Sequence, residues 1–422
     1  MSRRIFFTFF IKGIIAVTNL LIVILLSRYT GAAGKGEASL IITSIAMILL
    51  FNNIVGGAAL VYFVPRNNIF QLIFLSNCWS FIICCIAYAI LFFTTIIPPQ
   101  FLLHVVILSF INALFSTNST ILLGKERITQ YNIILLFQAT LNLISLFIMF
   151  KWGNSKNVNS YISSLYISML SCLLISSSSI LKYLKDISFK NIKSLGQELV
   201  KLGVTNQIGH TMKFISFRFT YYILSIYAGA SILGIYSNGV SLVESVLIIS
   251  NSFCTILYPR VANSKDIKKS QLLTIQYIKI NFILSAICLI SMSLLPSTFY
   301  VWLFGSEFSN VNQVVYLLAP GICVYSVSLI VGHYLSGTGN YKTPSYANLV
   351  GLITTVLLVL IFAPKFGLFE ISIISTISYI ATAGFITYYF IKKTNFKIKD
   401  LLPTINDFNL FCIEIKTIIK GQ

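Results

Sequence analysis

The chain has 422 residues, of which 57% are hydrophobic and only 10% are charged, and its mean hydropathy is +0.87. A soluble domain carries about a quarter charged residues, so this composition excludes a soluble globular protein and indicates a polytopic membrane protein. The net charge of +19 is spread over short segments instead of one basic domain, which favours an anionic membrane surface over nucleic acid as partner.

Apolar segments follow one another along the chain, and each is long enough to cross about 30 Å of hydrocarbon as a helix. The first segment has no small-residue cleavage site, so we expect it to be a retained span and not a signal peptide. The twelve expected spans are residues 5–27, 39–63, 70–97, 101–124, 131–151, 160–183, 202–227, 233–258, 272–297, 312–337, 344–364 and 369–391. The predicted fold class is therefore an all-α membrane protein.

The distribution of basic residues predicts the orientation of the spans. With the N-terminus in the cytoplasm, twenty Lys and Arg residues fall in cytoplasmic segments and five, Lys35 among them, in outer segments. This positive-inside bias predicts a multi-pass protein of the bacterial cytoplasmic (inner) membrane with both termini in the cytoplasm. The expected parts are a six-helix bundle at 1–183, an amphipathic cytoplasmic linker at 184–201, a six-helix bundle at 202–393, and a basic tail with a short interfacial helix at 394–422.

One short stretch occurs twice. LSRYTGAAGKG at 26–36 and LSIYAGASILG at 224–234 share six of eleven positions, and the apolar run after each copy ends in Pro-Arg, at 64–66 and 258–260. Each copy joins one span to the next on the outer side. The chain is therefore predicted to contain two six-helix bundles related by a parallel pseudo-two-fold repeat around a central cavity. The glycines would permit a tight outer turn where helix ends approach closely.

These motifs resemble a known family. The Gly…Gly outer turn, LGIYSNGVSLVES at 233–245 and LYPRVANSK at 257–265 are similar to the multidrug/oligosaccharidyl-lipid/polysaccharide exporter superfamily, and most of all to its O-antigen (Wzx-type) flippases. The resemblance implies translocation of an undecaprenyl-pyrophosphate-linked oligosaccharide, an O-antigen or capsule repeat unit, from the inner to the outer leaflet by alternating access. It also implies a polysaccharide polymerase and a chain-length regulator as partners. One departure is Thr220, where many relatives carry an acidic residue.

The seventh expected span has one polar side, which a helix at membrane depth needs a reason to keep. Arg218 and Lys213 on this side could bind an anionic head group, because Arg offers fork-shaped donors and Lys a point charge. Alternatively, the cationic side of this span forms an internal pair with Glu244 of the eighth span, which would hold the two halves together. The candidate substrate-binding residues are Lys213, Arg218, Arg28, Asn206, Gln207, His210 and Lys12.

Each candidate has a second interpretation. Glu244 could bind a coupling H⁺ or Na⁺, or serve only as a structural counter-ion. Lys12 could extend back to the cytoplasmic surface. Arg28, which has Ile226 as its counterpart in the second copy, could anchor the outer interface, and His210 could be an ordinary hydrogen-bonded side chain.

No motif for catalysis, a metal ion or nucleotide hydrolysis occurs, so we expect a secondary transporter without a cofactor. A multidrug or cation antiporter of the same superfamily is an alternative. Such an antiporter needs acidic cavity residues for its cationic cargo, whereas Lys213 and Arg218 outnumber the one glutamate here, so an anionic cargo fits better. A cell-wall lipid-II-type flippase is a further alternative, because its cargo is also anionic and would suit the same cationic residues. A polytopic polysaccharide polymerase is a weaker alternative, because the longest outer segment, at about 299–311, is short.

Overall fold

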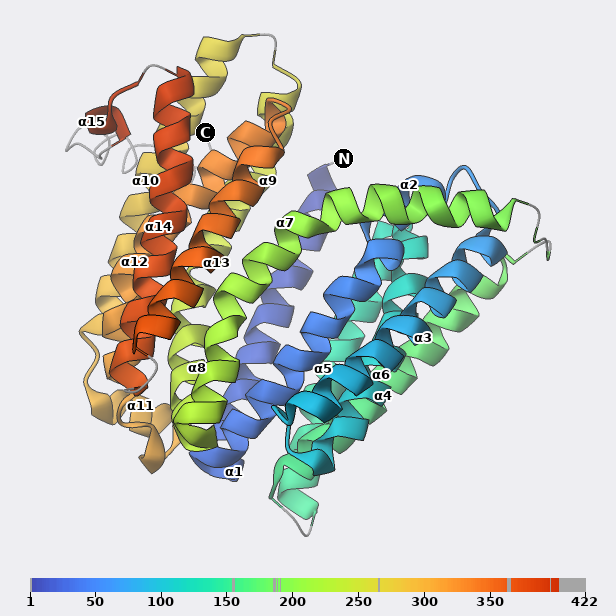
Figure 1. Cartoon of the computed structure of the whole chain (residues 1–422), viewed down its shortest axis with the longest axis horizontal. Helices are drawn as coiled ribbons and strands as arrows, with labels where there is room; N and C mark the ends of the chain where they lie inside the picture. Colours follow the sequence, from blue (N-terminus) through green and yellow to red (C-terminus); the bar gives the residue numbers. More distant parts are fainter. Residues whose placement is uncertain are drawn as a thin grey trace. The chain divides into compact units, whose positions relative to one another are not determined.

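The computed structural model describes residues 2–153, 156–184, 187, 189, 191–264, 266–362, 366–394 and 396–401. These residues form helices joined by short connections, and no β-strand occurs among them (Figure 1). The elements are α1 (Ser2–Gly56), α2 (Ala58–Phe63), α3 (Ile69–Thr94), α4 (Pro99–Gly124), α5 (Ile128–Trp152), α6 (Val158–Leu181), α7 (Ile192–Tyr227), α8 (Gly229–Ser245), α9 (Leu247–Ala262), α10 (Ile267–Ser293), α11 (Ser297–Phe304), the 3₁₀ turn η1 (Ser306–Phe308), α12 (Val311–Gly337), α13 (Lys342–Phe362), α14 (Leu368–Thr394) and α15 (Ile398–Leu401).

Ten helical segments of the described chain are long and apolar enough to cross a membrane, compared with twelve predicted spans. The difference has two causes. The first two predicted spans fall in one continuous candidate segment, Phe10–Phe63, in which the two helical stretches of α1 meet at Gly31 and α2 follows. The seventh predicted span lies in α7, where polar and charged side chains such as Lys213 and Arg218 lower the hydropathy. The protein is thus an all-α polytopic membrane protein, as predicted.

The chain folds into two units. Unit 1 comprises the chain up to Phe214 together with Tyr221–Ile235 and Leu303–Glu307, and unit 2 comprises Ile215–Thr220, Tyr236–Trp302 and the chain from Phe308 onward. Within unit 1, α4 packs against α1, α3 and α6, and α5 packs against α1 and α6. Within unit 2, α12 is the central helix and packs against α9, α10 and α14, while α13 packs against α14.

The repeated motif places a glycine with positive φ at the same position in both copies. Gly31 and Gly229 occupy the same motif position, and both have positive φ, 67° and 84° respectively. Other side chains rarely adopt this conformation, which explains the glycine in both copies.

The two copies of the motif also contact each other symmetrically inside unit 1. A Cβ atom at Gly36 would collide with the carbonyl oxygen of Ala230, and one at Gly234 would collide with that of Ala32. Each glycine thus meets the same motif position of the opposite copy, as a two-fold axis requires. Glycine permits this close approach of two helix backbones.

One residue of the first turn differs from the sequence expectation. Lys35 was expected in an outer segment, among exposed charges. It instead lies inside helix α1, is 5% exposed, and donates a hydrogen bond from Nζ to Ser39 Oγ at 2.6 Å. The helix after Gly31 starts earlier than predicted and takes Lys35 with it.

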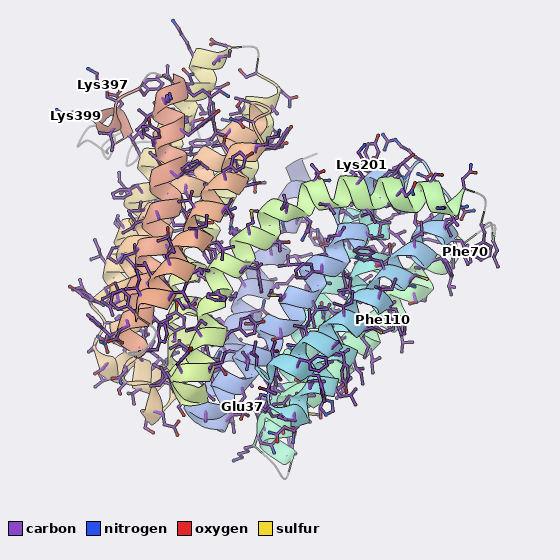
Figure 2. All side chains as sticks on the ribbon, viewed as in Figure 1. Glu37, Phe70, Phe110, Lys201, Lys397 and Lys399 are labelled. Carbon is purple, nitrogen blue, oxygen red and sulfur yellow. The ribbon has the colours of Figure 1, made fainter. Side chains whose placement is uncertain are left out.

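Helix α7 begins within the predicted linker, parts of which lie outside the described residues. Leu195 and Leu199 of its first turns are buried in the core of unit 1, beside Val55, Leu60 and Leu72. Figure 2 shows Lys201, on α7, at the opposite end of unit 1 from Glu37. The first part of α7 therefore packs on protein through its apolar side. The predicted interfacial stretch at 408–419 lies outside the described residues.

Candidate functional site

A salt bridge within unit 2 joins two of the predicted site residues. The Arg218 guanidinium donates from Nη1 to Glu244 Oε1 at 2.7 Å and from Nη2 to Glu244 Oε2 at 2.6 Å. The Arg and Glu side chains are 23% and 18% exposed, so most of the surface of the pair is covered by protein. Two parallel charge-assisted bonds fix both the distance and the plane of the two groups.

Aromatic packing holds the backbone that carries Arg218. The ring of Phe217 lies 4.9 Å from the ring of Tyr325 on α12 and 4.6 Å from that of Tyr379 on α14, measured between centroids. Both tyrosines are buried. This cluster fixes the Ile215–Thr220 segment of α7 within unit 2, so the position of the neighbouring guanidinium is set by packing and not by the ion pair alone.

A buried hydrogen bond holds the helix that carries Glu244. Tyr236 on α8 is fully buried and shares a hydrogen bond of 2.7 Å between its hydroxyl and Ser375 Oγ of α14. Glu244 is the residue before the end of α8, next to the turn at Val246 that precedes α9. The carboxylate therefore sits where a span changes from one helix to the next.

The other candidates on α7 belong to unit 1. Lys213 is partly buried, whereas Asn206 and His210 are exposed. Thr220 and Tyr221, which the helical wheel places on the polar side, are instead buried in protein, with exposures of 1% and 4%. The continuous polar face predicted for this span is thus interrupted in its last third.

Arg28 and Lys12 of α1 lie in different surroundings. Lys12 is exposed near the beginning of α1. Arg28 is exposed and donates from Nε to the carbonyl oxygen of Leu303 at 3.0 Å. Next to it, the Glu307 carboxylate accepts a 2.6 Å hydrogen bond from the Ala32 backbone N–H. The first motif turn is therefore connected to the Leu303–Glu307 segment by one side chain from each of the two segments.

Sequence reasoning did not find the roles of Lys35 and Glu307. Glu307 accepts a hydrogen bond from the backbone N–H of Ala32, which lies 275 residues earlier in the chain, and no local sequence pattern predicts such a contact. The signal available for Lys35 was its place between Gly34 and Gly36 in a repeated motif, where the second copy has an apolar residue.

The comparisons with known proteins agree with this architecture. A family model described as "Lipid II flippase MurJ" matches residues 133–413, about two thirds of the chain. The chain belongs to the MurJ lipid II flippase family. No curated protein matches the chain in sequence.

Solved structures support the same fold as the MurJ match. A lipid II flippase MurJ in an inward closed conformation superimposes with a TM-score of 0.76 at 17% identity, covering 98% of this chain and 92% of that one. An inward-facing multidrug resistance MATE family transporter of the MOP superfamily gives 0.68 at 14% identity, covering 90% and 96%. A mutant of the Vibrio cholerae MATE transporter VcmN gives 0.64 at 11% identity, covering 93% and 98%. The chain thus has the MOP-superfamily fold and is a transporter, not an enzyme.

Proposed function

We propose that this protein moves an undecaprenyl-pyrophosphate-linked cell-wall precursor of the lipid II type from the inner to the outer leaflet of the bacterial cytoplasmic membrane. The match to the lipid II flippase family over residues 133–413 carries this proposal. It supports a peptidoglycan precursor over the O-antigen unit that the local motifs suggested, and both cargoes share the anionic pyrophosphate.

The Arg218–Glu244 pair gives this cargo a chemical partner. Arg218 binds phosphate in the same two-pronged geometry in which it binds the carboxylate of Glu244. A pyrophosphate that takes the guanidinium leaves Glu244 without its counter-ion, and a carboxylate in that state binds a proton or Na⁺ more readily. Cargo binding and coupling-ion binding are then linked through one exchange of partners.

Lys213 contributes to the same proposal from the preceding part of α7. It is a point charge, and together with Arg218 it makes this span cationic while no other polar residue of its predicted wet side is charged. Asn206, Gln207 and His210 would then contact the cargo through neutral hydrogen bonds. Lys12, near the start of α1, and Arg28, just before its bend at Gly31, would attract the anionic head group.

A complementation experiment with two strains separates the cargoes. One strain is depleted of its lipid II flippase and lyses without a substitute, and the other lacks its O-antigen flippase and loses surface O-antigen. We expect the protein to restore growth of the first strain, and the Arg218→Gln variant to fail at equal membrane abundance. Restoration of the second strain alone would contradict the lipid II assignment and favour the O-antigen unit.

A further inference from the structure

Unit 1 contains a cavity of about 490 Å³ lined by residues of α1, α4, α5 and α6. Of the residues that line it, all of them within the described chain, Lys35 alone is charged. Its side chain is 5% exposed, and its ammonium group donates to Ser39 Oγ at 2.6 Å. The wall of the cavity therefore carries one basic side chain in a buried position, where a charge is costly without a partner.

The fold does not require a lysine at this position. The equivalent residue of the second motif copy is Leu233, which is fully buried in the same backbone setting after a glycine turn. Leucine therefore satisfies the packing demands of the position. Keeping an ammonium in the first copy needs another reason, and the cavity beside it supplies one.

The other polar groups of the wall define what the cavity recognises. Four amide side chains line it, from Asn19, Asn112, Gln138 and Asn142. The Asn142 amide is oriented by Ser164, whose Oγ donates to its Oδ1 at 2.9 Å. An amide both donates and accepts hydrogen bonds, so these groups suit the hydroxyl and amide groups of a sugar or a peptide.

Charge and volume narrow the ligand further. One ammonium balances one negative charge, whereas a phosphate or pyrophosphate would bring uncompensated charge into a buried site. The volume lies within the range of small-molecule pockets, about 300–1,000 Å³. A halide ion would leave most of it to water, at about 30 Å³ for each water molecule.

We propose that this cavity is a second binding site, separate from the Arg218–Glu244 pair, for a carboxylate carried on a sugar-like or peptide-like group. The carboxylate binds the Lys35 ammonium beside Ser39, and the amide side chains bind the attached hydroxyl or amide groups. The carboxylate belongs either to a free solute or to the head group of a lipid-linked cargo, and these two sources share the chemistry.

Direct binding to the purified full-length protein tests the site without any transport. Calorimetric titrations at constant ionic strength would compare glucuronate, glucose and acetate. We expect glucuronate to bind at least about tenfold more tightly than either of the others, because only it offers both the charge and the hydroxyl groups. Equal binding of acetate and glucuronate, or of glucose and glucuronate, would overturn the proposal.

Three variants assign the binding to the cavity. Lys35→Met removes the charge at similar size and should weaken glucuronate binding at least about tenfold. Gln138→Leu should weaken glucuronate binding and leave acetate unchanged. Lys151→Met, at an exposed lysine of the same unit, is the matched control and should bind like the wild type. Unchanged glucuronate binding by folded Lys35→Met protein would overturn the proposal.

A transport measurement identifies the source of the carboxylate, and this second arm alone rests on the proposed function. Proteoliposomes would receive an undecaprenyl-pyrophosphoryl sugar with a free carboxylate or with its methyl ester. Slower translocation of the free acid alone by Lys35→Met would assign the site to the cargo. Unchanged translocation of both, with glucuronate binding lost, would assign it to a free solute. Absence of translocation by the wild type would count against the proposed function and leave the binding result standing.

Discussion

The turn at 26–36 and the turn at 224–234 both bend the chain at a glycine with positive φ, and the closing glycine of each packs against the other copy. The two copies differ at five of their eleven positions, and at two of these a charged residue of the first turn is replaced by an apolar one in the second. The first turn has Arg28 and Lys35 where the second has Ile226 and Leu233. Internal symmetry thus fixes the backbone of both turns, while charged chemistry is confined to one of them. The two copies thus keep the glycines that their packing requires, while their other side chains differ.

The largest expected effect on stability comes from placing the lysine of the first turn at the equivalent position of the second turn. Leu233→Lys would bury an ammonium at a fully buried position, and an uncompensated buried charge costs about 3–5 kcal/mol. We expect severe loss of folded protein in thermal unfolding measured in detergent. The reverse change, Lys35→Leu, should leave the midpoint temperature nearly unchanged. Equal destabilisation by both changes would mean that Lys35 is structural.

The close approach of the two turns gives the next largest effect. Gly36→Val would place a side chain onto the Ala230 carbonyl, and because backbone cannot move aside easily, we expect a cost of at least about 3 kcal/mol. Gly234→Val should cost a similar amount, because it meets Ala32 in the equivalent way. Gly13→Ala, with no neighbour within 4 Å of the new Cβ, is the control and should not destabilise. A difference between the Gly36 and Gly234 variants in midpoint temperature would show that the symmetry is only approximate.

The charged pair of unit 2 has no counterpart in the first half, where Leu20 and Ala46 stand at the repeat-equivalent positions. Arg218→Gln or Glu244→Gln alone leaves one charge without its partner, and we expect each to cost about 2–3 kcal/mol because the pair is partly exposed. The double variant should recover most of the stability but none of the transport. Recovery of transport as well would contradict a role of Arg218 in cargo binding.

The smallest effects concern the two turn glycines themselves. Gly229→Ala meets no neighbouring atom and should cost only the strain of positive φ, about 1 kcal/mol. Gly31 has φ 67° and ψ −174°, a conformation that essentially only glycine adopts, and a Cβ there approaches the Glu307 carboxylate to 3.0 Å, so Gly31→Ala should cost more. Combining Gly31→Ala with Glu307→Ala should reduce that excess. Equal midpoint temperatures for the two single variants would show that the Glu307 contact does not strengthen the first turn.

The sequence alone determined the features that depend on local composition and spacing. Long apolar runs can only be helices in a membrane, because every backbone N–H and C=O must be satisfied within the segment. The repeated glycines located both bends of the chain, since positive φ is a local requirement. The sequence also left open an ion pair between Glu244 and a cation of the preceding span, and the structure assigns that pair to Arg218.

Only the tertiary structure decided which side chains each charge meets. Glu307 reaches the Ala32 N–H across 275 residues, and Lys35 turns from an expected surface charge into the cationic wall of a cavity built by four helices. Thr220 lies on the expected polar side of its span and is nevertheless buried. Helical periodicity gives the direction of a side chain around its own axis, but what occupies that direction is set by the packing of other helices, which a single sequence does not encode locally.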